Sequence, residues 1–434
     1  MIATMTSAAD FARGDATGVL MPSHPDALRA AGCGFLTEAF QAFGSLGEDN
    51  AVARVVRCAA FPGGNSGLKL ELTVEYERPD PSLDTELFAK FSRDLTDPFR
   101  DRRRAELEAE VRLARLSRHP AFPVDVARPW FADFDAGTGT GLLITTRIPF
   151  GSGQIEPMRL KCRDHELPER MEYYRATVTA LARLAGAHHA GRLSPDLDTL
   201  FPFVRAAAEA DLPIPFPIEQ TAGKARAIAR MVEAAPQLFP ATVVDPDFLR
   251  RFVREADAFR RHESVVKRFL YADPAFVALC HWNSNIDNAW FWRDPDGTMH
   301  CGLLDWGMVR QMNVGISLWG GLSAASPDLW SGDGLDALLG LFAAEYHAHG
   351  GPELDVAVLG LHFDLSVAMM GMALMMDAPE LIASRLPNHG RASSRLDPAL
   401  RDDQVGHGFL HVFTAFLELW ATRDFGAALA RITA

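Results

Sequence analysis

Two short polar segments of this 434-residue chain contain residue types that could carry chemistry. Residues 281–288 read HWNSNIDN, between the apolar runs VALC and AWFW, and residues 303–307 read LLDWG. A polar segment between strand-like runs is more typical of a functional loop than of packing. The sequence DPDG at 294–297 predicts a hairpin turn between the two segments. This turn would place Asn288, at the start of one strand, beside Asp305, at the end of the other.

These two side chains predict a site for a hard cation. Mg²⁺ prefers oxygen ligands and keeps several of its waters, so one amide oxygen and one carboxylate could hold it. We therefore expect Asn288 and Asp305 to share the ion. The alternative is that HWNSNIDN is a polar turn that caps the hairpin, because Asn and Asp favour turns.

A lysine inside an apolar strand is the second unusual feature. Lys90 lies in ELFAKFS, close to Phe88 and Phe91. A buried ammonium group needs a partner charge, and Glu110, on a helix predicted from about 101 to 117, is the expected partner. Two alternatives stay open. Lys90 could extend from an edge strand with its stem over apolar surface, and Glu110 could be an ordinary solvated helix residue.

The surrounding pattern predicts an α+β chain of two lobes. Residues 1–22 are predicted to be a flexible leader, and a helix capped by Ser23 is expected to run to the region of Gly44. Period-two alternation and β-branched residues predict strands within 51–61, 67–77, 86–92 and 141–150. From about residue 168 the apolar spacing is helical. We predict a strand-rich lobe at 23–150 and a helical lobe at 151–434, which contains the polar loop and the hairpin.

Composition limits the partners and the location. The net charge of −13 argues against a surface for nucleic acid or anionic membranes. The five cysteines are odd in number and include no CxxC pair, which is typical of a reducing compartment. The most apolar stretch, 365–376, is too short to cross a hydrocarbon core of about 30 Å. We expect a cytoplasmic protein without nucleic-acid or membrane partners, and its oligomeric state stays open.

Taken together, these segments resemble the protein-kinase-like fold, and more closely the aminoglycoside phosphotransferase and ecdysteroid-kinase-like families. PGGNSG at 62–67 resembles the glycine-rich loop, LFAKFS the strand with its Lys, and AELEAEVRLARL the helix with its Glu. HWNSNIDN resembles the catalytic loop HGDxxxxN, and LLDWG resembles the metal-binding strand end. The resemblance covers residues 25–320. It implies a small strand-rich N-lobe and a large helical C-lobe.

The resemblance also implies a phosphotransferase that uses Mg²⁺ and ATP or GTP on a small-molecule acceptor. Lys90 would contact the α- and β-phosphates, Glu110 would orient Lys90, and Asn288 and Asp305 would hold Mg²⁺. His281 would be a structural post rather than an acid–base catalyst. Further nucleotide contacts would come from the glycine-rich loop and from the hinge near 145–151: Gly63, Gly64, Asn65, Ser66, Gly67 and Thr145.

Three departures from the family pattern concern the catalytic step. The catalytic Asp falls on Asn283, which cannot accept a proton, its preceding Gly falls on Trp282, and a further Asp after LLDWG is missing. Phosphoryl transfer depends mostly on positioning and charge neutralisation, so Asn283 could orient an acceptor hydroxyl, and Asp287 is a candidate substitute base. The expected acceptor is an apolar alcohol or phenol. The alternatives are a pseudokinase that binds a nucleotide or a partner without transferring phosphate, and nucleotidyl transfer on the same fold.

Overall fold

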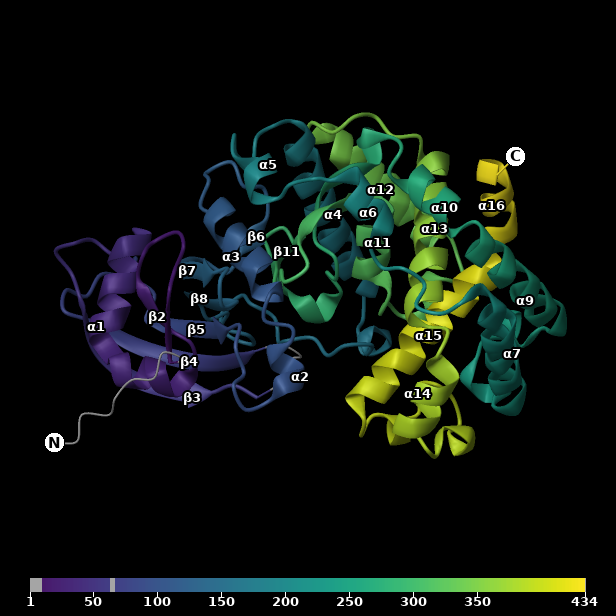
Figure 1. Ribbon diagram of the computed structural model, residues 1–434, viewed down its shortest axis with the longest axis horizontal. Helices are drawn as coiled ribbons and strands as arrows, with labels where there is room; N and C mark the ends of the chain where they lie inside the picture. Colours follow the sequence, from purple (N-terminus) through teal and green to yellow (C-terminus); the bar gives the residue numbers. More distant parts are fainter. Residues whose placement is uncertain (1–9, 63–66, 434) are drawn as a thin grey trace. The chain divides into compact units, whose positions relative to one another are not determined.

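The computed structural model describes residues 10–62 and 67–433 and shows an α+β fold, as the sequence predicts (Figure 1). The chain divides into a strand-rich unit and a helical unit. The strand-rich unit contains Met1–Ile155, Leu193–Phe201 and Gly302–Val309, and the helical unit contains Glu156–Arg192, Pro202–Cys301 and Arg310–Ala434. The segment that carries Asp305 therefore belongs to the strand-rich unit.

In the described residues, the strand-rich unit is built on a five-stranded antiparallel sheet. Side chains alternate between its faces, so Leu70, Leu72 and Val74 point into the core that α1 covers. Lys69 and Lys90 are directly opposite each other in the register and share the other face. The strand order is β3 (Val52–Ala60), β4 (Leu68–Tyr76), β5 (Glu86–Phe91), β8 (Thr140–Thr146) and β7 (Pro129–Asp135).

The first helix ends as predicted but begins with a different cap. Helix α1 spans Pro25–Phe43, and Gly44 ends it with a φ of 74°, a conformation that glycine adopts without strain. The N-cap is His24, not Ser23, and its Nδ1 accepts a hydrogen bond from the amide of Ala27 at 3.3 Å. The helix predicted from 101 to 117 is also shorter, because a turn over 102–105 separates α2 (Pro98–Asp101) from α3 (Glu106–Leu116).

The predicted flexible leader is wrong for residues 10–22. Strands β1 (Phe11–Arg13) and β2 (Leu20–Pro22) pair antiparallel, and Met21 is fully buried. The loop between them is held by the carboxylate of Asp133, which accepts hydrogen bonds from the amides of Ala16 at 3.1 Å and Thr17 at 2.7 Å. Strands of three residues held by one distant carboxylate give no periodic signal in the sequence.

The predicted hairpin is present and is extended by a third strand. Strand β10 (Ala289–Arg293) lies beside β11 (Met299–Leu303), and β11 pairs in parallel with β6 (Asp125–Val126). The turn contains Gly297, with a φ of 89°. A second pair, β9 (Val277–Cys280) with β12 (Arg310–Asn313), was predicted only at its first strand, since RQMN has no strand pattern.

Helices make up most of the helical unit, and α13 is at its core. This helix has 19 residues, where the sequence suggested an apolar stretch of twelve, and it is long and apolar enough to cross a membrane. However, 78% of its apolar window is buried inside the structure, which is typical of a core helix. It contacts α10, α11, α12, α15 and α16 (Figure 1).

The helices of this unit have the following bounds: α4 (Arg170–His189), α6 (Arg205–Ala210), α7 (Ile218–Ala234), α8 (Ala241–Val244), α9 (Pro246–Arg261), α10 (Glu263–Leu270), α11 (Val314–Leu322), α12 (Gly334–Ala348), α13 (Val356–Leu374), α14 (Ala378–Arg385), α15 (Gln404–Thr422) and α16 (Phe425–Thr433). The short α5 (Leu197–Leu200) belongs to the strand-rich unit.

Candidate functional site

Lys90 lies between two carboxylates in the strand-rich unit. Its Nζ donates a hydrogen bond to Glu110 on α3 and another to Oδ1 of Asp305 at 2.8 Å. The side chains of Lys90 and Glu110 are only 10% and 7% exposed. Strand β5 is central in the sheet, so the alternative of an edge-strand lysine over apolar surface is wrong.

The two carboxylates keep Lys90 charged despite its burial. Burial by itself lowers the pKa of Lys90, but the charges of Glu110 and Asp305 outweigh it and hold the pKa above its ordinary value. The ammonium group is therefore permanent and fixed in position. A fixed cation at the end of a buried stem is suited to binding an anionic group such as a phosphate.

Asp305 has an unusual backbone conformation. It lies two residues beyond the end of β11 rather than at the strand end, and its φ is 60°. The left-handed region costs a non-glycine residue about 1–3 kcal/mol and is enriched at functional sites. The indole of Trp306 donates to the carbonyl of Leu303 at 3.0 Å, which fixes this turn. Half of the Asp305 side chain is exposed, so its carboxylate is accessible.

Lys69 is a second lysine at this site, and it was not predicted from the sequence. It is the direct cross-strand neighbour of Lys90, and burial together with the charge of Lys90 lowers its pKa. Like charges opposite each other destabilise a sheet, and the charges of Asp305 and Glu110 offset this effect only in part at Lys69. An anion bound on this face of the sheet would reduce the remaining repulsion between the two lysines. The position of Lys69 opposite Lys90 follows from the register of β4 and β5, and no local sequence pattern predicts it.

The glycine-rich segment is described only in part. A side chain at Gly67 would lie 1.7 Å from the carbonyl oxygen of Phe91, and its φ is 52°, so this position requires glycine. Arg100 donates a hydrogen bond to the Gly67 carbonyl. Thr145 lies on β8, opposite Phe88 of β5. The remaining predicted phosphate-loop residues lie outside the described residues: Gly63, Gly64, Asn65 and Ser66.

In the helical unit, Asn285 organises the polar loop. Its Nδ2 donates to Oδ1 of Asn283 at 2.5 Å and to the carbonyl of Gly320 at 2.9 Å, and its Oδ1 accepts from the amide of Ala324 at 2.9 Å. Asn285 is 2% exposed. No role was predicted for Asn285, although it is the middle Asn of HWNSNIDN. It is a positioning residue for Asn283.

Helix α11 contacts the same loop through Gly320 and Ser317. A side chain at Gly320 would lie 1.7 Å from the carbonyl oxygen of Trp282, so only glycine allows this approach. The hydroxyl of Ser317 donates to the carbonyl of His281 at 2.7 Å. His281 is buried, and its Nδ1 accepts from the amide of Asn283 at 3.0 Å. These contacts suit the structural role predicted for His281.

Asn288 offers an oxygen that could bind a cation. Its Nδ2 donates to the carbonyl of Asn283 at 2.8 Å, which leaves the amide oxygen as the ligand atom. In the described parts of the chain, no group of three or more His, Cys, Asp or Glu residues could hold a metal. Asn288 belongs to the helical unit and Asp305 to the strand-rich unit. In proteins, Mg²⁺ is typically bound by one or two protein oxygens, and phosphate oxygens and waters complete its coordination shell.

Asp164 is a buried acidic residue of the helical unit that interacts electrostatically with Asp287. Asp164 is 2% exposed, its Oδ2 accepts from the hydroxyl of Tyr174 at 3.1 Å, and its Oδ1 is buried without a hydrogen-bond partner. Burial, and then the charge of Asp287, raise the pKa of Asp164 to about 7. The sequence offered no signal for this residue, since a single Asp in RDHE reads as a surface turn.

The Asp164→Asn variant should be more stable than the wild type at pH 8 but not at pH 4. Because the pKa of Asp164 is raised to about 7, the folded protein holds a proton that the unfolded chain loses between about pH 4 and 7. Stability therefore falls as the pH rises through this window, by up to about 4 kcal/mol, and Asn removes this loss. Urea unfolding at both pH values measures the difference.

Asp397→Asn is a control in which the same substitution should change stability at pH 8 in the opposite direction. Hydrogen bonds from the amides of Ser393 and Ala399 lower the pKa of this exposed carboxylate, so its removal should lower stability at pH 8. An Asp164→Asn variant that is equally destabilised at both pH values would contradict the assignment of a raised pKa.

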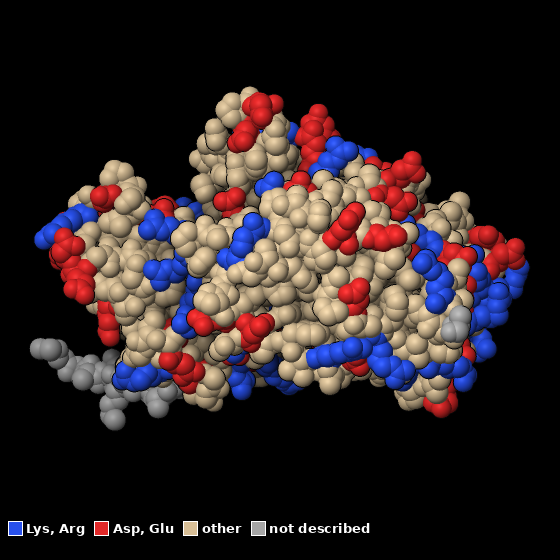
Figure 2. All heavy atoms as spheres, turned by 90° about the horizontal axis from the view of Figure 1, so that it is seen from above, with Lys and Arg blue, Asp and Glu red and all other residues tan. Residues whose placement is uncertain are grey.

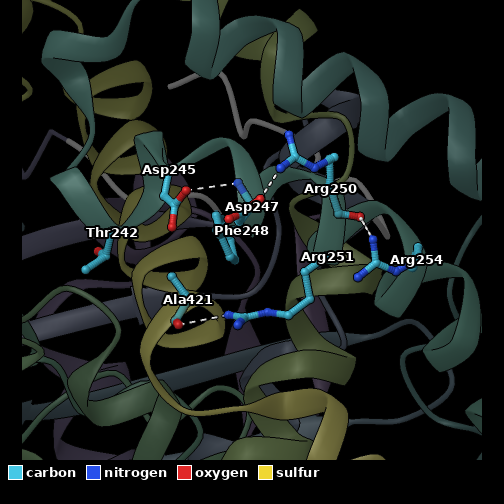
Figure 3. Close-up of a pocket in the computed structure, with 8 residues that line it drawn as sticks. All are labelled: Thr242, Asp245, Asp247, Phe248, Arg250, Arg251, Arg254 and Ala421. Atoms are coloured by element: carbon cyan, nitrogen blue, oxygen red, sulfur yellow. Dashed lines mark hydrogen bonds and ion pairs between the residues drawn. The ribbon is translucent and has the colours of Figure 1, made fainter.

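A surface hollow on the helical unit contains none of these residues. Lys and Arg side chains gather at the right-hand end of Figure 2, where Figure 1 shows α7 and α9. In the hollow, Arg250 pairs with Asp247, Arg251 donates to the carbonyl of Ala421 at 2.9 Å, and Arg254 donates to that of Arg250 at 3.2 Å (Figure 3). Its arginines are thus engaged within the protein. The lining residues are Thr242, Asp245, Asp247, Phe248, Arg250, Arg251, Arg254 and Ala421.

No protein-family model matches the sequence, and no curated protein matches it. The chain is similar to solved structures of small-molecule phosphotransferases and kinases. One is a mutant aminoglycoside 2′-phosphotransferase in complex with GDP, at 13% identity and a TM-score of 0.38, covering 87% of this chain and 95% of the other.

Two further similar structures have comparable coverage. Choline kinase from Cryptosporidium parvum is 10% identical with a TM-score of 0.44, covering 87% of this chain and 91% of that one. A spectinomycin phosphotransferase in complex with ADP and spectinomycin is 12% identical with a TM-score of 0.37, covering 84% and 94%.

Proposed function

We propose that the protein is a phosphotransferase that uses Mg²⁺ and ATP or GTP to phosphorylate a hydroxyl of a small, apolar metabolite. The observation that carries this proposal is the ammonium group of Lys90, held in a central strand by Glu110 and Asp305. A buried ion pair is weak support for stability, so its retention needs another reason. A strand Lys paired with a helix Glu, beside a metal-binding Asp, is the arrangement that kinases need for phosphoryl transfer.

The nucleotide phosphates would meet positive charge from two strands. Lys90 would contact the α- and β-phosphates, and Lys69, directly opposite it, would supply a second cation. Backbone amides at 63–67 would cover the phosphates, and Thr145 would line the nucleotide site. Asn288 and Asp305 would hold Mg²⁺, which neutralises phosphate charge when bound.

Asn283 would orient the acceptor. Its Oδ1 accepts from Asn285, which leaves its Nδ2 to donate to the oxygen of an acceptor hydroxyl. An amide cannot take up the proton of that hydroxyl. A phenol, with a pKa of about 10 as in Tyr, is partly ionised more readily than an alcohol and suits this site.

A nucleotide-binding pseudokinase is the second candidate, because the residue at the position of the catalytic base is Asn283. The complete Lys90, Glu110 and Asp305 arrangement favours the enzyme, since phosphoryl transfer needs all three residues and a protein without this activity need not keep the full set. The two proposals differ in one observable, the formation of a phosphorylated product.

Calorimetric titration with Mg·ATP and Mg·GTP is expected to show binding of at least one nucleotide. Asp305→Ala should remove this binding, and Lys69→Met should weaken it by about 10- to 100-fold, as expected for a lost hydrogen bond between charged groups. Arg54→Met, which changes an exposed cation on β3, is the matched control and should bind normally.

Mass spectrometry of pooled alcohols and phenols incubated with protein and nucleotide then tests the reaction. A phosphorylated product that is absent with Asp305→Ala is the expected result. Binding without any product would favour the pseudokinase, and failure to bind either nucleotide would contradict both proposals.

A further inference from the structure

One side of α15 carries polar side chains inside the helical unit. His407, His411 and Glu418 are spaced by four and seven residues, which places them on the same side of the helix. They are 4%, 3% and 5% exposed, respectively. Buried polar groups cost folding free energy unless they are hydrogen bonded.

These residues and two neighbours form a cluster, the α15 polar cluster: His165, Arg395, His407, His411 and Glu418. The rings of His407 and His411 are 6.5 Å apart, and the charges of Arg395, His407 and His165 all act on His411. Each of the five side chains has one buried polar atom without a hydrogen-bond partner. Native proteins leave few such atoms, so their concentration here points to a bound polar group.

His411 shows what that group must offer. Its Nε2 lies 2.8 Å from the carbonyl oxygen of Ala325, so Nε2 carries the proton and donates. Burial lowers the pKa of His411 to about 4, so the ring is neutral and Nδ1 has a lone pair. The unpartnered Nδ1 therefore needs a hydrogen-bond donor from the ligand.

Arg395 and Glu418 require a ligand group that can both accept and donate a hydrogen bond. Arg395 Nη2 and Glu418 Oε2 are 3.5 Å apart and form an ion pair, with side chains 11% and 7% exposed. Arg395 Nη1 remains a donor and Glu418 Oε2 an acceptor. A hydroxyl group can satisfy both, because it donates and accepts. Because Arg395 and Glu418 already neutralise each other, a charged ligand gains little net attraction here, and a carboxylate could not donate to His411.

The cluster is connected to the polar loop through residues 324–326. The amide of Ala324 donates to Asn285, which holds Asn283, and the carbonyl of the next residue, Ala325, accepts from His411. All these residues belong to the helical unit. A ligand in the cluster would thus be close in the hydrogen-bond network to the residue proposed to orient the acceptor.

We propose that the α15 polar cluster binds an uncharged, hydroxylated part of the acceptor. The acceptor is then an otherwise apolar alcohol or phenol with at least one hydroxyl beyond the one that reacts, and not a cationic amine or a carboxylate. The assignment of this ligand as the acceptor rests on the proposed phosphotransferase function.

The test compares uncharged probes with charged ones of similar size. Resorcinol and 1,4-butanediol are the uncharged probes, and choline and glycerate are the charged ones. Binding is measured by calorimetry without nucleotide, and phosphorylation is measured with Mg·ATP and Mg·GTP. We expect an uncharged probe to bind and react in preference to the charged ones.

Two single variants locate the binding, a double variant shows that the fold is intact, and a surface variant is the control. Arg395→Met and His411→Phe should each raise the Kd and KM of the preferred probe by about 10- to 100-fold, with kcat changed less than about twofold. Arg395→Met combined with Glu418→Gln removes both charges together and should keep the thermal stability while losing the probe. Arg254→Met, in the hollow on α9, is the control and should behave as the wild type.

The possible outcomes separate this inference from the proposed function. If an uncharged probe binds the wild type but not the variants and no product forms, the cluster is confirmed as a binding site and the phosphotransferase fails. If product forms equally well in the variants, the cluster holds only water and the inference is overturned, while the proposed function stands. Preference for choline or glycerate, or binding of no probe, also overturns it.

Discussion

Replacement of Lys90 by Met is expected to abolish nucleotide binding and to lower the free energy of unfolding by about 3–5 kcal/mol. The loss of stability follows because the substitution leaves the buried carboxylate of Glu110 without its counter-ion, which is the most costly way to break a buried ion pair. Asp305 contributes less to this cost, because half of its side chain reaches solvent.

The double variant Lys90→Met with Glu110→Gln separates the structural role from the binding role. It removes both buried charges, so most of the lost stability should return. Nucleotide binding should not return, because the phosphates still lack the ammonium group. Urea unfolding gives the stabilities, and titration with Mg·ATP and Mg·GTP gives the affinities.

The exposed pair of Arg54 on β3 and Glu75 on β4 is the matched control for this experiment. Both side chains are more than half exposed, so Arg54→Met should change stability little. A double variant that binds nucleotide as tightly as the wild type would show that Lys90 and Glu110 only support the fold.

The parts of the site that the sequence predicted are those with a local signal. Lys90 stands out because a charged residue interrupts an apolar strand, and the DPDG turn predicts the hairpin between Asn288 and Asp305. The α+β class follows from the change from period two to helical spacing. Each of these signals is read from windows of roughly 11–18 neighbouring residues.

The residues that were missed depend on contacts between distant segments. Lys69 matters only because the register of β4 and β5 places it opposite Lys90. Asn285 is bonded to α11 and to Ala324, more than thirty residues away. Asp164 meets Tyr174 and Asp287 only in the folded helical unit. The local patterns of one sequence do not show which residues become cross-strand neighbours or which polar groups become buried.

Asn283→Ala is expected to lower kcat by about 100-fold while the affinity for nucleotide is unchanged. The reason is that phosphoryl transfer depends on positioning, and a loss of orientation at the acceptor costs about this much. The loop should keep its shape in this variant, because Asn285 still donates to Gly320 and accepts from Ala324. Asp287→Ala should lower kcat by less than about tenfold if Asp287 has no role as a base.

The variant Asn283→Asp tests whether a base is truly absent from the wild type. Its carboxylate can still accept from Asn285 through one oxygen, while the other can take up the proton of the acceptor. With a phenol acceptor, the wild-type rate should rise with pH toward the acceptor pKa of about 10, and the Asn283→Asp rate should depend on pH much less. If Asp287→Ala proves more damaging than Asn283→Ala, Asp287 is the base and the role assigned to Asn283 is wrong. If neither alanine substitution changes the rate of a reaction that Asp305→Ala abolishes, the acceptor is oriented by other residues of the helical unit.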